Sequence, residues 1–506
     1  MNKNVSYEHK AHFITTSPSH RAPTNKRMVT KIYPMLLFCM LFLLITVLLS
    51  GCKKHDITPS FQYTVDNTRK TATITGYTGD ATEIEVPRKI QEYEITTIAS
   101  SAFAGRSDLK SIIIPDSVTS IEAAAFSGCS SIESITIPFL GANKFAKSAS
   151  DSTLFGYIFG TLDYAGAVAI NQSYSKNDSI TYYLPSSLTS VTVTGGEVFY
   201  GAFNNCYILT NVTIGDLVTA FGPYALSGCT GITHITVPFV GERENSSENT
   251  HFGYIFGAPD HLSQNQYIPS TIKSVCITGG SKIGGFSFYN CNHLTSITLP
   301  DSITSMNFNT FAGCDQLIVT ENGIHYVDTW VIGCDSDVSV ANLRASAKGI
   351  ADQAFRAKKN LTSVTIGNSL VTIGSYAFYD CFNLTSVTMG DSVKSIGDFA
   401  FRSCMRLTSV IFGKSVSSIG IHAFYHCANL ATVDIPDSVT SIGTEAFGAC
   451  LKLTSIIIPK SVKLLGGSVF NRCENLTIYC EAESQPDDWD ASWNMNHPVI
   501  WGYKES

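Results

Sequence analysis

Ten cysteines occupy one position of a recurring phrase, and thiols at a regular spacing could form disulfides or bind a metal ion. The last five follow one another at intervals of 23 residues. The ten are Cys129, Cys206, Cys229, Cys291, Cys314, Cys381, Cys404, Cys427, Cys450 and Cys473. If each phrase forms one coil of a stack, neighbouring cysteines lie about 5 Å apart, which a disulfide can span. Cysteine is also a small apolar residue that cores favour, so we interpret this cysteine ladder as core packing, with disulfides as the alternative.

Other residue patterns give little support to metal binding or catalysis. Structural zinc sites usually use closely spaced cysteine pairs, and the chain has no C-x-x-C motif. His422 and His426 are four residues apart but lack a third ligand, and Asp487, Asp488 and Asp490 lack the spacing of a calcium-binding loop. The sequence contains no G-x-S-x-G, H-E-x-x-H, P-loop or dinucleotide-binding motif. We therefore predict a binding protein rather than an enzyme, with no catalytic residue, no metal and no cofactor.

The composition indicates a folded chain with an uneven distribution of charge. Only 15% of the 506 residues are charged and 44% are hydrophobic, which is not typical of a disordered protein. Residues 1–51 carry six basic residues and one acidic residue, whereas the remainder carries 28 basic and 40 acidic residues. Because a body with that excess of acid repels phosphate backbones, we expect no nucleic-acid partner.

A large apolar residue stands three positions before each ladder cysteine, and we call the segment around it the box. These residues are Phe126, Phe203, Leu226, Phe288, Phe311, Phe378, Phe401, Phe424, Phe447 and Phe470. Phe103 and Phe355 take the same position, but Arg106 and Lys358 stand where the cysteine would be. A recurring box of this kind predicts one continuous solenoid rather than several separate domains.

Residues 361–383 show what one coil is expected to form. Val364 and Ile366 are two residues apart among hydroxyl residues, which predicts a half-buried strand. Leu370 and Ile373 mark a second extended piece. One coil turns apolar side chains inward but cannot bury them alone, so stacked neighbours must cover them with parallel strands about 4.8 Å apart.

The spacing within the box predicts one turn of helix. Ala377, Phe378 and Cys381 fall at intervals of three and four residues, which places them on one face of a helix. The expected fold is therefore an α/β solenoid.

The phrase resembles the leucine-rich repeats of the BspA-like class, which occur on surface proteins of anaerobic bacteria. The resemblance covers residues 109–131, 209–231, 294–316 and 361–475. It implies a curved, right-handed solenoid with parallel strands on one face. It also implies adhesion to host extracellular proteins or to other cells. Capture of a glycan or another nutrient polymer is the alternative, and a purely structural role in the cell envelope is a third possibility.

Segments at both ends are predicted to cover the open coils of the array. Residues 61–86 alternate as a β-hairpin would, and Trp489, Trp493 and Trp501 gather after the last repeat. A solenoid needs its terminal core sealed, so capping is our interpretation, with a carbohydrate platform of the three tryptophans as the alternative.

Three inserts interrupt the array. The phrase Phe-Gly-Tyr-Ile-Phe-Gly occurs at residues 155–160 and again at 252–257, and a third insert surrounds residues 327–334. The polar stretches 171–179 and 242–250 are predicted to be exposed loops, which often carry recognition. The expected organisation is a signal peptide (1–51), a tether (52–60), a cap with the first box (61–108), the array (109–475, with inserts near 139–183, 239–267 and 318–350) and a second cap (476–506).

The amino-terminal region has the features of an export signal. The apolar run at residues 35–49 follows basic residues and is shorter than the roughly 20 residues that a membrane-spanning helix needs. It ends in Leu49, Ser50, Gly51 and Cys52, which resembles the lipobox of bacterial lipoproteins. The resemblance implies cleavage before Cys52 and attachment of acyl chains to that residue, with an uncleaved anchor as the alternative.

Several acyl chains on one residue would attach the protein stably to a membrane. No acidic residue directly follows Cys52, so the inner-membrane retention signal of the lipoprotein family is absent. The expected location is therefore the outer membrane or the cell surface. Met28 is a second candidate for the start of the chain, because the residues before it are long and polar for a signal peptide.

A solvent-facing row of side chains is the candidate binding face. In each strand phrase the first, fourth and sixth residues are expected to point inward, which leaves the fifth outside. The row includes Thr298, Thr365, Thr388, Ile411, Asp434 and Ile457, preceded by Ile113, Thr136, Thr213 and Thr236. Uncharged, partly apolar surfaces favour protein contact, although threonine and isoleucine are also ordinary strand residues.

Overall fold

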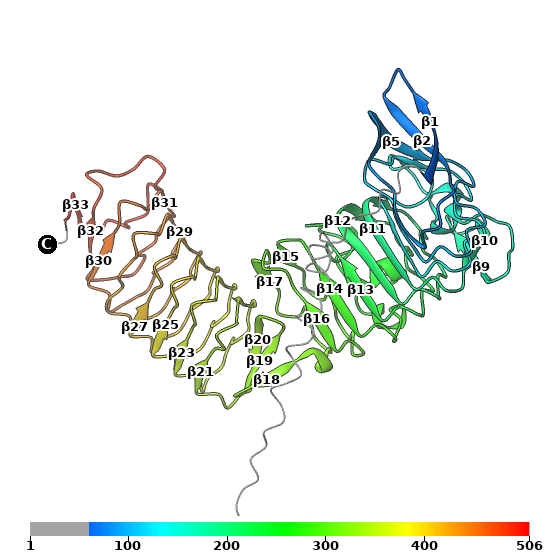
Figure 1. Ribbon diagram of the computed structural model, residues 1–506. Coiled ribbons are helices and arrows are strands. Elements are labelled where there is room, and N and C mark those ends of the chain that lie inside the picture. Colours follow the sequence, from blue (N-terminus) through cyan, green and yellow to red (C-terminus); the bar gives the residue numbers. More distant parts are fainter. Residues whose placement is uncertain (1–59, 505–506) are drawn as a thin grey trace, which may run out of the picture. The chain divides into compact units, whose positions relative to one another are not determined.

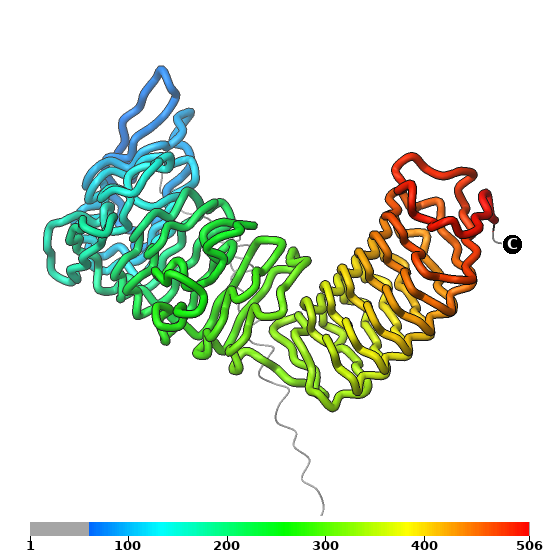
Figure 2. The backbone as a smooth tube through the Cα atoms, turned by 180° about the vertical axis from the view of Figure 1, so that it is seen from behind, coloured from blue at the N-terminus to red at the C-terminus, as the bar shows by residue number. Residues whose placement is uncertain are grey.

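Each coil of the chain contributes two short strands and one turn segment, and successive coils stack side by side (Figures 1 and 2). The computed structural model describes residues 60–504. The signal peptide predicted at residues 1–51 and Cys52 with its lipobox lie outside the described residues. The solenoid predicted from the repeated phrase is confirmed, since strands 23 residues apart pair in parallel.

The first strand of each coil joins a parallel arrangement that we call the first-strand ladder. Its pairing keeps equivalent residues together, so Val364 pairs with Val387 and Val387 with Val410. Its first eight strands form one sheet, namely β3 (Glu83–Glu85), β6 (Ser111–Ile113), β8 (Ser134–Ile137), β11 (Ser190–Val198), β12 (Asn211–Phe221), β13 (His234–Val237), β14 (Ser274–Ile277) and β16 (Ser296–Thr298). Two further sheets continue it, namely β21 (Val340–Asn342), β23 (Ser363–Thr365), β25 (Ser386–Thr388) and β27 (Ser409–Ile411), then β30 (Ser455–Ile458), β32 (Thr477–Cys480) and β33 (Val499–Trp501).

The second extended piece of each coil also pairs, so the structure has a second-strand ladder in addition to the one face of strands that the resemblance implied. Most of its strands have only two residues, because glycine or another turn residue ends each piece. They are β5 (Tyr93–Ile98), β7 (Ser120–Ile121), β15 (Lys282–Ile283), β17 (Ser305–Met306), β20 (Trp330–Cys334), β22 (Gly349–Ile350), β24 (Thr372–Ile373), β26 (Ser395–Ile396), β28 (Ser418–Ile419), β29 (Ser441–Ile442) and β31 (Leu464–Leu465).

The helical turn predicted at the box is wrong. Residues 375–380 form a run of turns, and residues 60–504 contain no α-helix. Tyr376 and Asp380 have φ angles of 57° and 60°, which lie in the left-handed region and are incompatible with an α-helix. The helical content is limited to the 3₁₀ helices η3 (Asp151–Thr153), η4 (Phe155–Ile158), η5 (Phe252–Phe256), η6 (Gln264–Gln266) and η7 (Asp315–Leu317).

Hydrogen bonds between coils replace the helical ones. Alternate N–H groups of each box donate to carbonyl groups of the following coil, as in the pairs Tyr376–Asp398, Phe378–Ala400 and Asp380–Arg402 at 2.9, 2.7 and 3.0 Å. The same pattern recurs one coil later from Phe399, Phe401 and Ser403. The box therefore pairs with its neighbours much as a strand does, although its backbone is not extended.

The core is a continuous column of apolar side chains between the two ladders and the boxes. The rings of Phe355, Phe378, Phe401 and Phe424 stack nearly parallel, with centroids 4.8, 4.9 and 5.1 Å apart. All four are fully buried. Since burying one such side chain contributes roughly 1.5–3 kcal/mol, the stack binds each coil to the next.

The two related inserts fill the place of a missing box. The ring centroid of Phe159 lies 6.2 Å from that of Phe126, and the ring centroid of Phe155 lies 5.0 Å from that of Phe203. The insert therefore continues the phenylalanine stack between these two boxes. A buried glutamine holds each insert, because Gln172 accepts a hydrogen bond from the amide of η4 at Gly156 and Gln264 accepts one from Gly253 in η5.

One predicted loop in these inserts is confirmed, and the other is confirmed only in part, because residues 174–178 form a loop between two strands. Residues 171–179 belong to a hairpin of β9 (Ala167–Ser173) and β10 (Ser179–Pro185), and the side chain of Gln172 is buried. Residues 242–250 contain no strand and are mostly exposed. The third insert is a meander of β18 (Val319–Glu321), β19 (Ile324–Val327) and β20 that buries Trp330.

Both ends of the stack carry additional structure. At the first coil, β1 (Phe61–Asp66) pairs antiparallel with β2 (Thr71–Tyr77), which pairs with β5, and β4 (Lys89–Ile90) also pairs with β5. At the last coil, Trp489 and Trp493 are 4% and 1% exposed, and Trp493 packs on Phe470. Capping remains our interpretation of both segments. Within residues 60–504, no helix has the length and apolar composition needed to cross a bilayer.

Candidate binding surfaces

The ladder cysteines contribute to the core and to the hydrogen bonds between coils. Cys381 Sγ donates to the carbonyl of Phe355 at 3.0 Å, and Cys404 Sγ donates to that of Phe378 at 3.2 Å. Burial raises the pKa of Cys381 to about 12 and holds the pKa of Cys404 well above its ordinary value. None of the ladder cysteines forms a disulfide within residues 60–504. A protonated, buried thiol is a poor nucleophile and a poor metal ligand, so we exclude the ladder as a site.

The histidine pair does not form a shared ligand face. His422 Nε2 lies 3.3 Å from a carboxylate oxygen of Glu445, and its ring stacks on Phe399 with centroids 4.9 Å apart. Both rings contact Tyr425, with centroid distances of 5.1 Å for His422 and 6.5 Å for His426. Among residues 60–504, no group of three or more His, Cys, Asp or Glu side chains is arranged to hold a metal ion.

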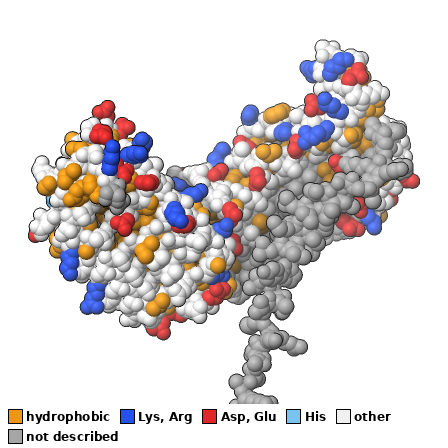
Figure 3. Space-filling model, turned by 60° about the vertical axis from the view of Figure 1, so that its left-hand side comes forward, with side chains coloured by type: hydrophobic (Ala, Val, Ile, Leu, Met, Phe, Trp, Pro, Cys, Tyr) orange, Lys and Arg blue, Asp and Glu red, His pale blue; other side chains and the backbone are white. Residues whose placement is uncertain are grey.

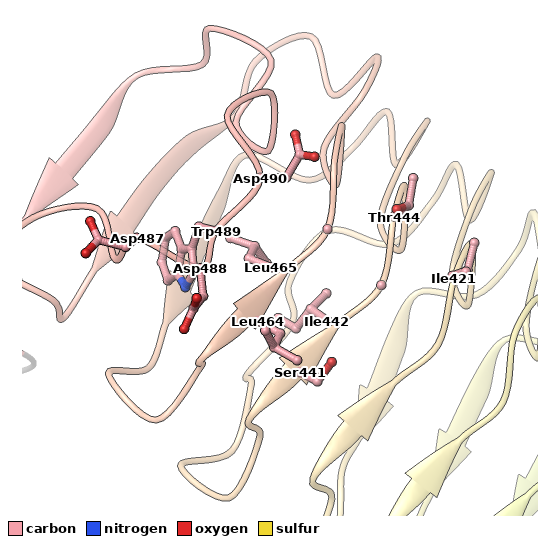
Figure 4. Close-up of a pocket in the computed structure, with 12 residues that line it drawn as sticks. Ile421, Ser441, Ile442, Thr444, Leu464, Leu465, Asp487, Asp488, Trp489 and Asp490 are labelled. Atoms are coloured by element: carbon pink, nitrogen blue, oxygen red, sulfur yellow. The ribbon is translucent and has the colours of Figure 1, made fainter.

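A shallow groove of about 470 Å³ lies beside β29 and β31, next to the segment with the three aspartates (Figure 4). In Figure 4 the carboxylates of Asp487, Asp488 and Asp490 point in different directions. Asp490 accepts hydrogen bonds from the hydroxyl and amide groups of Ser492, and these bonds lower the pKa of its carboxyl. The groove therefore lacks a convergent set of ligands.

The structure brings part of the solvent-facing row together. Thr365 pairs with Thr388 and Thr388 with Ile411 across β23, β25 and β27, and all three side chains are exposed. The side chain of Ile411 is 60% exposed. In the next two coils Asp434 is exposed and forms a single bridge with Ile457, which is half-buried.

Thr298 does not join these residues. It lies on β16, the last strand of the eight-stranded sheet, and the third insert separates that sheet from β21. Thr298 is exposed and pairs with Cys276 on β14. The predicted row is therefore two rows, one on each side of the third insert.

Sequence reasoning missed three members of the second row. Asn342 pairs with Thr365 at one end, and Tyr479 and Ile500 continue the row beyond Ile457 at the other. These residues lie in the third insert and in the terminal segment, where the repeated phrase is not recognisable. No alternation in the sequence marks the first of them, because Val340 is apolar and yet exposed.

Two kinds of threonine alternate along this face. The hydroxyl of Thr385 donates to the carbonyl of Thr362 at 2.9 Å, and the hydroxyl of Thr408 donates to that of Thr385 at 3.1 Å. By contrast, the hydroxyls of Thr365 and Thr388 make no hydrogen bond within residues 60–504. The first kind holds coils together, whereas the second is free to bind.

Charge is sparse on the surface. On the face shown in Figure 3, basic and acidic side chains are scattered among larger uncharged areas. Around β23, β25 and β27, residues 362–368, 385–391 and 408–414 include only one lysine and one aspartate. A partner would therefore displace little tightly bound water from charged groups at this face.

Comparison with known families identifies the repeat. A family model described as "BspA type Leucine rich repeat region" matches residues 77–155, 156–248, 261–335 and 348–477, in six copies. No curated protein matches the chain.

Solved structures of bacterial proteins resemble the chain at low identity. A leucine-rich repeat protein from Bacteroides ovatus is 20% identical, with 87% of this chain and 98% of that chain covered and a TM-score of 0.30. A leucine-rich cell surface protein from Faecalibacterium prausnitzii is 22% identical, with 88% and 97% covered and a TM-score of 0.28. The pneumococcal vaccine antigen PcpA is 16% identical, with 87% and 97% covered and a TM-score of 0.32.

Proposed function

This chain belongs to the family of BspA-type leucine-rich repeat proteins, and on that premise we propose that it is a surface protein that binds macromolecules through the first-strand ladder. The partners we propose are extracellular host proteins or the surfaces of other cells. The observation that carries the proposal is the row of Thr365, Thr388 and Ile411, which is in register, exposed and uncharged. Free hydroxyls and an exposed isoleucine suit a protein contact that mixes hydrogen bonds with apolar burial.

The test replaces the surface chemistry of the row without disturbing the core. We expect the combined variant Thr365→Glu, Thr388→Glu and Ile411→Lys to weaken adhesion to immobilised extracellular matrix proteins by about tenfold or more, because charges would be buried unpaired at the contact. The control Ser247→Glu changes the net charge by the same amount in the loop at residues 242–250 and should leave adhesion nearly unchanged. Loss of adhesion in the control alone would place the site on the inserts.

A glycan array run beside the matrix proteins separates adhesion from the alternative of glycan or nutrient-polymer capture. Binding of the wild-type chain to glycans only, with no matrix protein retained, would support the alternative. Proteolysis of intact cells asks a different question, namely whether the array faces outward, and protection of the array from protease would contradict a surface role.

We also propose that Cys52 carries a lipid anchor to the outer membrane or the cell surface. The lipobox formed with Leu49, Ser50 and Gly51 supports this, because small residues precede the cysteine. Cys52→Ala should leave an unprocessed precursor that takes up no radiolabelled palmitate, since the thiol is the attachment atom. Ser50→Ala keeps a small residue and should still be labelled. Palmitate incorporation into Cys52→Ala would contradict the anchor.

A further inference from the structure

A column of alternating arginine and tyrosine runs along the box face, away from both strand ladders. Arg356, Tyr379, Arg402 and Tyr425 occupy the same position in four successive coils, 23 residues apart. The guanidinium carbon of Arg356 lies 5.4 Å from the ring centroid of Tyr379, and that of Arg402 lies 4.9 Å from the ring centroid of Tyr425. These cation–π contacts hold each arginine against a ring of the following coil.

A glycine allows the last ring of the column to lie flat. Gly448 follows Tyr425 in the column, and a Cβ at Gly448 would stand 2.8 Å from ring atoms of Tyr425. Any other residue there would place its Cβ too close to the ring of Tyr425 and would displace that ring.

A second column of rings lies beside the first. The rings of Tyr376 and Phe399 stack with centroids 4.6 Å apart, and the ring of Phe399 stacks on that of His422 at 4.9 Å. Tyr376 also contacts Tyr379 in the first column, and Arg402 lies 5.5 Å from the ring centroid of Phe399. We call the two columns together the arginine–aromatic lattice.

Apart from His422, whose Nε2 lies 3.3 Å from a carboxylate oxygen of Glu445, most polar groups of the lattice are unused. The guanidinium of Arg402 makes no hydrogen bond and no ion pair within residues 60–504, although aromatic rings hold it in place. Arg356 donates one hydrogen bond, to Gln353. The hydroxyls of Tyr376, Tyr379 and Tyr425 make no hydrogen bond within that range. Immobilised donors with no partner are typical of a binding surface, because ordering them for a ligand costs little further entropy.

The lattice is also the basic part of an acidic protein. Residues 353–360, 376–383 and 399–406 contain five Lys or Arg and one Asp, whereas residues 52–506 as a whole contain 28 basic and 40 acidic residues. Lys358 within this set donates to the carbonyl of Cys334, so its charge lies partly inside the stack. The remaining positive charge favours an anionic ligand.

We propose that the arginine–aromatic lattice binds an acidic polysaccharide, a site that does not depend on the first-strand ladder. Arg356 and Arg402 are two coils apart, and the ring intervals of 4.8 and 4.9 Å place their coils about 10 Å from each other. One sugar ring of an extended polysaccharide is close in length to one coil. A chain with an acidic group on every second sugar therefore matches the two arginines, with the intermediate sugar over Tyr379.

The chemistry of the ligand follows from the two kinds of donor. Guanidinium groups pair with carboxylate or sulfate through two parallel hydrogen bonds, and phenol hydroxyls bond to sugar hydroxyls. A nucleic acid fits poorly, because the acidic remainder of the protein repels a chain with a charge on every residue.

The test measures hyaluronan binding, since hyaluronan carries one carboxylate on every second sugar and the sugars between are uncharged. We expect the double variant Arg356→Gln and Arg402→Gln to raise the Kd by about tenfold or more, because it removes both charge-assisted contacts. Arg69→Gln and Arg243→Gln together remove the same charge at exposed sites elsewhere and should change the Kd less than about twofold. Arg402→Lys keeps the charge but loses the planar contact, so an intermediate Kd is expected.

Three results would overturn the proposal. The first is equal weakening in the lattice variant and in the control pair, which would mean unspecific attraction. The second is binding of polyglutamate or single-stranded DNA as tightly as hyaluronan, and the third is no hyaluronan binding by the wild-type chain. The row variant at Thr365, Thr388 and Ile411 should retain hyaluronan binding, and the lattice variant should retain protein adhesion, so either proposal can fail alone.

Discussion

At the scale of single residues, the spacing of the ladder cysteines predicted their burial but not their hydrogen bonds. Their even spacing and apolar neighbours predicted burial, and Cys381, Cys404 and Cys427 are fully buried. The spacing could not reveal that these three thiols donate to carbonyl groups 26 residues earlier, because that contact depends on the turn geometry of the box. One residue type thus combines small volume with a hydrogen bond to a carbonyl group of the preceding coil.

Burial of these thiols makes the stability of the array depend on pH. Burial raises the pKa of Cys229 and of Cys381 from 9.0 to about 12, so the unfolded chain loses these protons first. The free energy of unfolding should be constant below about pH 8.5 and should fall between about pH 9 and 12, by up to about 1.4 kcal/mol per pH unit for each buried thiol. Urea denaturation at pH 7, 8, 9 and 10 measures this slope.

A matched variant isolates the thiols from other groups that titrate at high pH. Cys404→Ser with Cys427→Ser keeps a donor for the carbonyls of Phe378 and Phe401 but does not titrate in this range. The slope above pH 9 should become shallower by about the contribution of two thiols. An unchanged slope would mean that tyrosines, such as the buried Tyr182, cause the loss instead.

At the scale of elements, sequence patterns predicted the strands better than the boxes. Val364 and Ile366 predicted the strand correctly, because the alternation of apolar and polar residues indicates which face of a strand is buried. The box residues share the three- and four-residue spacing of a helix, but Tyr376, Phe399 and His422 adopt positive φ without being glycine or asparagine. Nothing in their side chains indicates this conformation, since the hydrogen bonds between coils impose it.

The two kinds of threonine around β25 should differ in their effect on stability. Thr385→Val removes a hydroxyl that donates to Thr362 at 2.9 Å, and we expect a loss of about 1 kcal/mol. Thr388→Val has a nearly identical shape change but removes a free hydroxyl, so its effect should stay within about 0.5 kcal/mol. Urea denaturation of the two variants provides the comparison. Equal losses would contradict the division between coil-binding and free hydroxyls.

At the scale of the whole molecule, the 23-residue period predicted the solenoid, but the internal contacts of the inserts could not be predicted from the sequence. The two Phe-Gly-Tyr-Ile-Phe-Gly phrases were visible, but their buried glutamines were not. Gln172 lies 16 residues after Gly156 and comes from β9, whereas Gln264 lies 11 residues after Gly253 and comes from η6. Because spacing and element both differ, no sequence pattern relates the two. The break between Thr298 and Thr365 was hidden for the same reason, since the third insert has no repeat phrase.

Deletion of whole coils should be tolerated better than deletion of parts. Removing residues 384–406 takes out one period and rejoins equivalent faces, so the variant should melt cooperatively with a modest loss of stability. Removing residues 384–394 shifts inward positions outward and should abolish cooperative melting. Thermal unfolding followed by circular dichroism compares the two. Similar melting curves would contradict a structural unit of 23 residues.

The one-way hydrogen bonds between boxes give the stack an electrical direction. From Gln353 to Ser468 the box amides that bond between coils all point toward the following coil, so their peptide dipoles add along the stack rather than cancel as they do in an ordinary sheet. The positive pole lies at the last coil, where the amide of Ser468 faces the segment of Asp487, Asp488 and Asp490. Lys358 stands at the opposite pole, in the first box of this run, where cysteine would otherwise be. These opposite charges suggest that a stack built this way has distinguishable ends, as a helix does, and that its end segments are not interchangeable.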